Sequence, residues 1–194
     1  MKLNKTFWTK RYQNNTIGWD AGKITTPLKE YIDQLNDKNC KILIPGAGNS
    51  YEAEYLHKKG FTQVYVLDLV MQPLDNILQR VPTFPAYNLL LGDFFDLEDT
   101  FDLVIEQTFF CALDPKLRDQ YVDKMYDILN PNGKIAGVLF QFPLTEEGPP
   151  FGGSKQEYLE RFSSKFKIKT LETAYNSIKP RAENELFIIF EKKN

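Results

Sequence analysis

The sequence predicts an α/β protein with a doubly wound sheet of seven strands, mixed but mostly parallel. Short apolar runs typical of buried strands alternate with segments of helical periodicity along most of the chain. Within CKILIPGAGNSYEAE (40–54), a turn with two glycines joins a strand to a helix. Without Cβ atoms, the backbone of such a turn can approach a ligand closely at the rim of the sheet. We therefore expect a single domain over residues 1–194 with a ligand site at this turn.

Each expected strand is an apolar run bounded by turn residues. These runs lie at 41–44, 64–67, 87–91, 101–105, 134–140, 166–174 and 186–191. The spacing of apolar residues predicts helices near 7–12, 27–36, 50–60, 74–78, 114–129 and 155–162. Asn130–Gly133 is expected to form a turn, and 142–154 a loop rich in Pro and Gly. The short connection between the last two strands predicts an antiparallel hairpin at one edge of the sheet.

The composition is ordinary for a soluble globular protein. A formal net charge of -2, with no basic stripe, gives no general attraction to nucleic acid or to an anionic membrane. Cys40 and Cys111 lie far apart in or beside apolar strands and are expected as buried reduced thiols. The basic N-terminus lacks the apolar stretch of a signal peptide, no run is long enough to cross a membrane, and no Cys/His spacing suggests a metal site. We expect a cytoplasmic monomer that acts on a small molecule.

The residues after the glycines indicate the kind of nucleotide-like ligand. Tyr51 occupies the place where a dinucleotide site needs a third glycine, which argues against NAD or FAD. Asp68 ends the next strand, where a carboxylate can accept hydrogen bonds from a ribose diol. Asp93 ends the third strand beside Phe94, an arrangement that suits an adenine amino group and its ring. A ligand with ribose and adenine but no pyrophosphate fits S-adenosylmethionine. The alternative is that Asp68 caps a strand and Asp93 is a turn residue.

Several stretches carry a resemblance to a known family. IPGAGNSYEAEYL, VYVLDLV, LLLGDFFDL, FDLVIEQTFFCALDP and LNPNGKIAGVLF occur in this order. The chain resembles the Rossmann-like class I S-adenosylmethionine-dependent methyltransferases, and within them the thiopurine S-methyltransferase superfamily, especially its thiol/halide methyltransferase branch. The likeness covers nearly the whole chain. Its specific parts are EQTFFCALDP, GPPFGGSKQEY, which resembles that branch's substrate-side loop, and an upstream group formed by Trp8, Tyr12, Trp19, Asp20, Gly22 and Pro27.

The resemblance implies that residues 1–26 cover the cofactor and that a defined set of residues contacts it. This set is Trp8, Tyr12, Trp19, Gly46, Gly48, Asp68, Leu69, Asp93, Phe94, Glu106 and Gln107. Tyr12 stands where the family commonly has a second tryptophan, and Gln107 where relatives carry other side chains. Pro45 replaces the acidic residue that precedes the first glycine in many methyltransferases, a departure that this superfamily shares.

The aromatic residues of the N-terminal segment suit a cationic ligand. Methyl transfer from a sulfonium is an in-line displacement in which alignment of the two reactants supplies much of the rate. Aromatic faces stabilise cations, so Trp8, Tyr12 and Trp19 on a segment that covers the cofactor could surround the sulfonium. The alternative is that these rings only fasten the N-terminal helix to the sheet.

The residue types favour a sulfur acceptor. A thiol with a pKa of about 8.5 is already a few per cent thiolate at neutral pH and barely needs a base. His57, the only histidine, lies near the far end of its predicted helix and is expected to be a surface residue. The candidate catalytic residues are Asp20, Glu106 and Arg181. Asp20 or Glu106 could accept a proton, Glu106 could also contact the methionine amino group or the acceptor, and Arg181 could meet an anionic acceptor. A cap or ion pair for Glu106 and a solvated surface position for Arg181 are the alternatives.

The sequence therefore predicts methyl transfer from S-adenosylmethionine to a small sulfur nucleophile: a thiol, sulfide or thiopurine-like heterocycle, with halide as a further acceptor. A small-molecule O- or N-methyltransferase is the nearest alternative. A catalytically silent module that binds S-adenosylmethionine is the alternative from another class. An NAD-dependent reductase is disfavoured by Tyr51 and by the second acidic site at Asp93.

Overall fold

A computed structural model describes residues 2–194, which form one seven-stranded sheet in the order β3-β2-β1-β4-β5-β7-β6. Neighbours from β3 to β5 are parallel, and β7 pairs antiparallel with both β5 and β6. This confirms the predicted fold and its antiparallel edge hairpin. The strands are β1 Ile42–Pro45, β2 Val64–Asp68, β3 Leu89–Leu91, β4 Phe101–Gln107, β5 Leu129–Phe140, β6 Phe166–Thr173 and β7 Glu185–Lys192.

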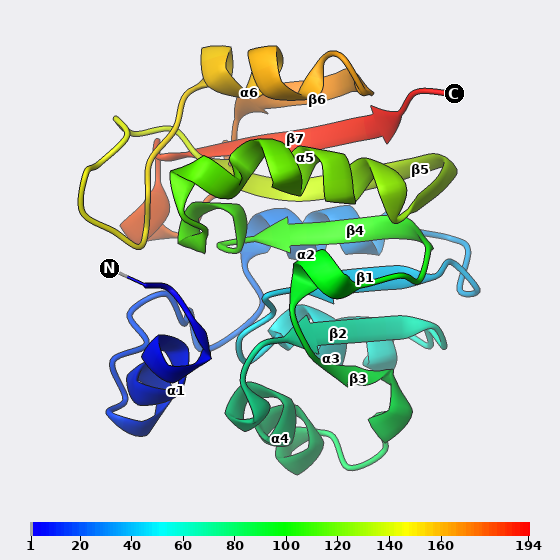
Figure 1. The fold of residues 1–194 in the computed structure, drawn as a ribbon. Helices are drawn as coiled ribbons and strands as arrows, with labels where there is room; N and C mark the ends of the chain where they lie inside the picture. The colour runs from blue at the N-terminus through cyan, green and yellow to red at the C-terminus, as the bar shows by residue number, and fades with distance from the viewer. Residues whose placement is uncertain (1) are drawn as a thin grey trace.

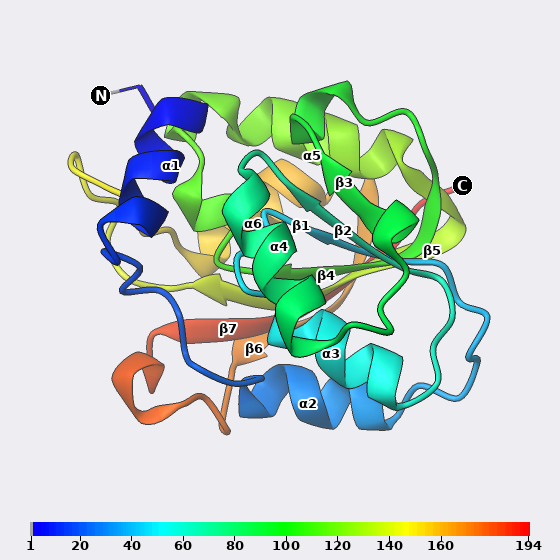
Figure 2. The same ribbon diagram turned by 90° about the horizontal axis from the view of Figure 1, so that it is seen from below.

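Helices cover both faces of the sheet (Figures 1 and 2). Leu28, Leu56 and Ile77 of α2, α3 and α4 belong to one buried cluster, and Met125 and Phe162 of α5 and α6 belong to the other. The helices are α1 Lys5–Gln13, α2 Thr26–Asp33, α3 Tyr51–Lys58, α4 Met71–Arg80, α5 Arg118–Asp127 and α6 Lys155–Phe162. No helix among residues 2–194 is both long and apolar enough to cross a membrane.

The central strands are apolar on both sides because both sides are covered. Ile42 and Ile44 of β1 pack into the cluster beneath α2, α3 and α4, whereas Leu43 between them packs into the cluster beneath α5 and α6. Successive side chains of a strand point to opposite faces of the sheet, and here both faces are buried. It explains why these strands appear in the sequence as continuous apolar runs.

The chain changes direction across the sheet at β1. After β1 it adds β2 and β3 on one side, and then β4 and β5 on the other. Such a reversal opens a crevice at the carboxyl ends of the central strands, where open α/β sheets bind ligands. The N-terminal segment and α1 lie beyond these strand ends (Figure 1), so the segment covers the crevice.

Several boundaries differ from those that the sequence predicts, and those of β5 and β3 are instructive. Asn130–Gly133, predicted as a turn, lies within β5, where the pairing with β4 shifts between Phe101↔Leu129 and Leu103↔Lys134. These four residues therefore belong to β5, where they form an irregularity in the pairing, and Asn132 has a φ of 63°. β3 has only three residues, because Ala86–Asn88 forms a 3-10 turn instead of the start of a strand.

Candidate active site

The glycine turn follows β1 and requires glycine at both positions. Gly46 and Gly48 have a φ of +54°, which side chains rarely adopt. A Cβ at Gly46 would also lie 2.0 Å from Cδ2 of Phe109, so this ring sits directly against the turn. At Gly48 a Cβ would lie 3.4 Å from the Tyr12 hydroxyl, an ordinary contact distance, so there the backbone angle is the constraint.

Asp68 ends β2 beside this turn, as the sequence predicts. Its carboxylate accepts hydrogen bonds from the backbone N–H of Gly48 at 3.2 Å and of Val70 at 2.9 Å. Burial raises the pKa of Asp68 to about 6. Leu69, which follows, is half-buried. The structure thus brings Asp68 and the glycine turn together at one rim of the sheet.

Three aromatic residues of the N-terminal segment lie over the turn. The Trp19 ring packs edge-to-face against Trp8 at 5.5 Å and against Tyr12 at 5.8 Å between ring centroids. Burial and the nearby Asp68 carboxylate raise the pKa of Tyr12 well above its usual value, so its hydroxyl stays neutral. These rings form a layer above Gly48, the position expected for a segment that covers a ligand.

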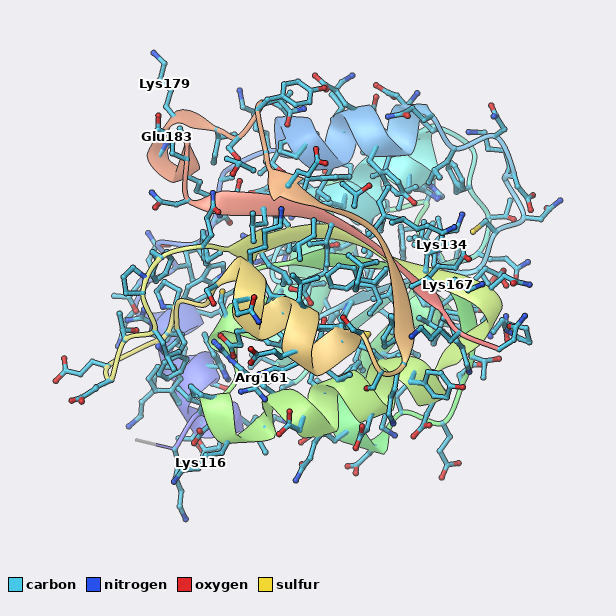
Figure 3. The ribbon with its side chains drawn as sticks, turned by 90° about the horizontal axis from the view of Figure 1, so that it is seen from above. Lys116, Lys134, Arg161, Lys167, Lys179 and Glu183 are labelled. Atoms are coloured by element: carbon cyan, nitrogen blue, oxygen red, sulfur yellow. The ribbon has the colours of Figure 1, made fainter. Side chains whose placement is uncertain are left out.

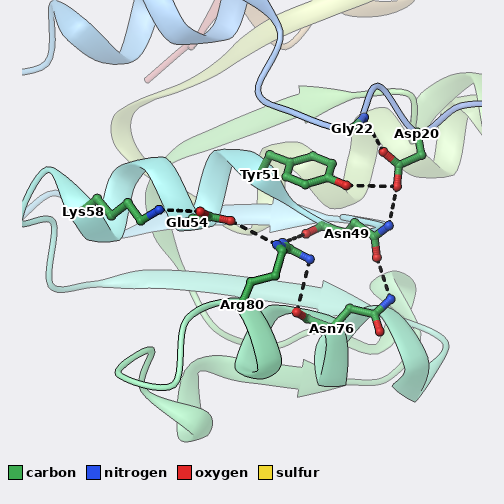
Figure 4. Close-up of polar contacts among 8 residues, drawn as sticks. All are labelled: Asp20, Gly22, Asn49, Tyr51, Glu54, Lys58, Asn76 and Arg80. Carbon is green, nitrogen blue, oxygen red and sulfur yellow. Dashed lines mark hydrogen bonds and ion pairs between the residues drawn. The ribbon is translucent and has the colours of Figure 1, made fainter.

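Asp20 joins this segment to the glycine turn (Figure 4). Its carboxylate accepts hydrogen bonds from the Gly22 N–H at 2.6 Å, from the Asn49 side-chain amide and from the Tyr51 hydroxyl at 3.4 Å. The predicted catalytic carboxylate therefore lies at the site, with donors of the protein on both oxygens.

A second network, which the sequence analysis missed, supports the turn from α4. Arg80 donates to the backbone carbonyl of Asn49, to the carbonyl of Asn76 at 3.2 Å and to the Glu54 carboxylate at 3.0 Å (Figure 4). Its guanidinium also lies 4.7 Å from the centroid of the Tyr51 ring. No local signal marks Arg80, because its partners Asn49, Tyr51 and Glu54 come from another part of the chain.

Glu106 near the end of β4 is fully buried. It accepts hydrogen bonds from the N–H of Phe109 at 2.9 Å, the N–H of Phe110 at 3.0 Å and the hydroxyl of Tyr121 at 2.5 Å. Burial raises the pKa of Glu106 to about 7. These bonds hold the turn after β4, and this turn places the Phe109 ring against Gly46.

Gln107, the last residue of β4, faces a buried glutamate that the sequence analysis did not single out. The Gln107 side chain accepts a hydrogen bond from the Thr25 hydroxyl at 2.5 Å and lies 3.4 Å from Oε1 of Glu52. Glu52 is only 5% exposed, and burial raises its pKa to about 7. Its position on the apolar face of α3, four residues before Leu56, is a signal that a helical-wheel analysis could have found.

Asp93 and Phe94 follow β3 at the same rim. The N–H of Gly92 donates to the carbonyl of Asp68 at 3.0 Å, which ties the two strand ends together. Asp93 is exposed and accepts from the Phe95 N–H at 3.0 Å. Phe94 is buried, with its ring centroid 5.2 Å from that of Phe109.

Arg181 lies in the 3-10 turn before β7 and is buried, not solvated. It donates to the carbonyl of Trp19 at 2.6 Å and pairs with Glu185 at 3.3 Å. It therefore fastens the N-terminal segment to the antiparallel hairpin.

Between these elements lies an open cleft, whose volume of about 490 Å³ includes the space open to solvent. Its wall consists of residues from three segments: 19–23, 44–52 and 105–108. A smaller pocket nearby is lined by Glu106, Thr108, Cys111, Val138–Phe140 and Glu185. A glycine turn with an acidic strand end, an aromatic cover and a carboxylate-lined wall fit the ribose and the cationic groups of S-adenosylmethionine.

The strand order, the glycine turn at β1 and the acid at the end of β2 define a class I S-adenosylmethionine-dependent methyltransferase fold. The sequence profile of the family described as thiopurine S-methyltransferase matches residues 3–193. The chain belongs to the thiopurine S-methyltransferase family. This membership confirms the predicted class of enzyme, an S-adenosylmethionine-dependent S-methyltransferase.

Several methyltransferases with names match the chain. Probable thiol methyltransferase 2 of Arabidopsis thaliana is 28% identical over 156 residues, which cover 78% of this chain and 69% of that protein. Thiocyanate methyltransferase 1 of Brassica oleracea is 24% identical over 151 residues, which cover 74% of this chain and 66% of that protein. Thiopurine S-methyltransferase of Nitrosospira multiformis is 27% identical, over 87% of this chain and 86% of its own length.

Solved structures share the fold at low identity. The 1,6-didemethyltoxoflavin-N1-methyltransferase of Burkholderia thailandensis, with bound S-adenosylhomocysteine, has a TM-score of 0.73 and 16% identity, and covers 98% of this chain and 87% of its own. A TehB-like methyltransferase from Corynebacterium glutamicum has a TM-score of 0.66 and 20% identity, over 97% and 98% of the two chains. At these identities the likeness shows the fold alone.

Proposed function

We propose that this protein transfers a methyl group from S-adenosylmethionine to a small sulfur nucleophile, namely a thiol, sulfide or thiopurine-like heterocycle, with halide as a further acceptor. The observation that carries this proposal is the cleft at the glycine turn, which Trp19 also lines, with Asp68 hydrogen-bonded to Gly48 of the same turn. The names of the relatives support sulfur as the acceptor atom, since they comprise thiol, thiocyanate and thiopurine methyltransferases.

Bound S-adenosylmethionine supplies an electrophilic methyl group on a sulfonium. In this proposal Asp68 accepts hydrogen bonds from the ribose, while the glycine turn and Leu69 line the nucleoside. Asp93 and Phe94 lie at the strand end where the adenine would be held. Trp8, Tyr12 and Trp19 exclude water and present aromatic surface to the cation, and this supports the transfer because alignment and desolvation supply much of the rate.

The acceptor needs little help from a base in this site. Both oxygens of Glu106 accept hydrogen bonds from within the protein, and Asp20 is engaged in the same way. His57 lies on α3, with its ring 3.0 Å from Thr83. These contacts support a soft nucleophile that attacks as an anion. Asp20, Glu106 and Arg181, the candidate catalytic residues of the sequence, then contribute to the reaction by holding the cover and the turns around the cleft.

A panel of acceptors tests the proposal directly. S-adenosylhomocysteine should raise the melting temperature and NAD should leave it unchanged, since a ligand that binds only the folded state stabilises it by mass action. Methyl transfer should then be faster to thiols, hydrosulfide or iodide than to phenols or amines. Preference for phenols or amines would overturn the acceptor class, and the absence of any transfer would favour a silent binding module.

The cytoplasmic location and the monomeric state expected from the sequence stay part of the proposal. Both cysteines carry free thiols, which supports a reducing compartment.

A further inference from the structure

The carboxylate of Glu52 is buried, faces the cleft and has little to bind within the protein. It lies in the first turn of α3 and forms part of the cleft wall together with Trp19 and Gln107. Its hydrogen bond to another side chain is the contact with the Gln107 amide, at 3.4 Å, and its own backbone N–H also lies close to the carboxylate. The residue is only 5% exposed. Arg80 and Arg181 favour its ionised form from a distance, but among residues 2–194 they form their ion pairs with Glu54 and Glu185.

The other carboxylates around the cleft are engaged. Asp68 accepts two backbone N–H groups, and Asp20 accepts three donors. Glu106 accepts two N–H groups and a hydroxyl, and Glu185 pairs with Arg181. A buried carboxylate with few donors is costly unless a cation or a further donor reaches it. Glu52 is therefore the acidic group of this wall that a ligand could complete.

The surroundings of Glu52 prepare it for a cationic hydrogen-bond donor. The Thr25 hydroxyl donates to the Gln107 side-chain oxygen, which turns the Gln107 amide nitrogen toward Glu52 and fixes the side chain. Burial keeps the pKa of Glu52 near 7, so an arriving cation meets a group that it can hold ionised at neutral pH. Water is largely excluded, and a charge-assisted hydrogen bond is stronger in such a setting.

We propose that Glu52 binds the α-ammonium group of the methionine moiety of S-adenosylmethionine, with Gln107 as the residue that positions its carboxylate. This inference rests on the proposed function, because it assigns one contact of the same site. The ammonium carries three donors and a full charge, which matches a buried carboxylate with at least one free oxygen. Glu52 then orients the methionine arm and so helps to direct the sulfonium toward the acceptor.

Calorimetric binding to the full chain tests the assignment with three probes. S-adenosylhomocysteine carries the ammonium, S-adenosyl-4-thiobutyrate keeps the carboxylate but lacks the ammonium, and 5′-methylthioadenosine lacks the whole arm. Glu52→Gln should weaken S-adenosylhomocysteine binding by about tenfold or more. Binding of 5′-methylthioadenosine should stay within about twofold of the wild type, and S-adenosyl-4-thiobutyrate should bind as well as before or better, because the loss of a negative charge favours a carboxylate.

Two further variants keep the assignment falsifiable. Glu52→Asp retains the charge but withdraws it by one methylene, so the loss for S-adenosylhomocysteine should be smaller than in Glu52→Gln. Glu106→Gln is the rival, because Glu106 has the same burial. Equal losses for all three probes in Glu52→Gln, no loss at all, or a selective loss in Glu106→Gln alone would overturn the role of Glu52. A wild-type chain that binds none of the probes would instead refute the proposed function, and the inference with it.

Discussion

Two buried glutamates at one rim of the sheet have opposite surroundings. Glu106 accepts hydrogen bonds from Phe109, Phe110 and Tyr121, whereas Glu52 has a single contact of 3.4 Å with Gln107. Burial raises both pKa values to about 7. Equal burial and an equal pKa therefore do not mean an equal role. Glu106, with three donors, holds a turn of the protein, whereas Glu52, with one long contact to another side chain, is the carboxylate that we propose a ligand completes.

The largest expected difference between Glu106 and Glu52 is the effect of their replacement on the free energy of unfolding. Glu106→Ala leaves three buried donors without an acceptor, so we expect the free energy of unfolding to fall by about 3–5 kcal/mol. Glu52→Gln removes a charge that has no strong partner, and the ligand-free protein should stay within about 1 kcal/mol of the wild type at pH 8 or become more stable. Urea unfolding monitored by circular dichroism measures both. Similar losses in the two variants would erase the contrast.

The next largest expected effect is the pH dependence of the free energy of unfolding. Burial raises the pKa values of Glu52, Asp68 and Glu106 to between about 6 and 7, so the folded chain keeps protons that the unfolded chain releases above about pH 4.5. Stability should therefore fall as the pH rises from 4.5 to 7.5. Glu52 alone should account for on the order of 2 kcal/mol of this loss. Chemical denaturation across this range should show a flatter curve for Glu52→Gln, and an unchanged slope would contradict the assigned pKa shift.

Carboxyl groups with lowered pKa values do not alter the pH dependence expected between pH 4.5 and 7.5. Asp33, Glu54 and Asp99 lie near lysines that lower their pKa values, so their contributions change at more acidic pH. Saturating S-adenosylhomocysteine should reverse the loss of stability that Glu52 causes near neutral pH, because an ammonium bound to Glu52 favours its ionised form.

Asp68 is intermediate between the two glutamates, since two backbone N–H groups hold it and a ribose could still reach it. Asp68→Ala should weaken S-adenosylhomocysteine binding by about 1–3 kcal/mol through the loss of hydrogen bonds to the ribose. The same loss should appear with 5′-methylthioadenosine, which distinguishes Asp68 from Glu52. Calorimetry measures both affinities, and unchanged values would remove Asp68 from the site.

The smallest expected effect concerns Arg80, which supports the glycine turn without reaching the cleft. Arg80→Met frees the Asn49 carbonyl and should weaken S-adenosylhomocysteine binding by about 1 kcal/mol. Arg161→Met is a matched control, because both arginines have side chains that are 27% exposed and pair with carboxylates. Arg161 lies on α6 (Figure 3) and pairs with Asp119 of α5, and none of its ion pairs or hydrogen bonds reaches the glycine turn. Equal losses of affinity in the two variants would show that Arg80 has no specific effect on the turn.

Much of the fold could be predicted because its signals are local. Strands buried on two faces are short apolar runs, and the turn after β1 needs glycine for reasons of backbone geometry alone. Asp68 follows from its place at a strand end. The position of Glu52 on the apolar face of α3 is a local signal, but its contact with Gln107 arises only when α3 and β4 pack together. Arg80 has no such signal, because its contacts with Asn49 and Glu54 arise only when α4 packs against α3. The irregularity at Asn130–Gly133 was read as a turn because its residues are typical of turns, while its pairing with β4 is a long-range property.

Arg181 and Asp20 together fix the N-terminal cover at Trp19. Arg181 holds the carbonyl of Trp19, and the neighbouring Asp20 is bound to Asn49, so the chain is anchored there on two sides. The rings of Trp8 and Tyr12 on α1 pack edge-to-face against Trp19. The place of this helix above the glycine turn therefore depends on Arg181, which lies 162 residues further along the chain than Trp19.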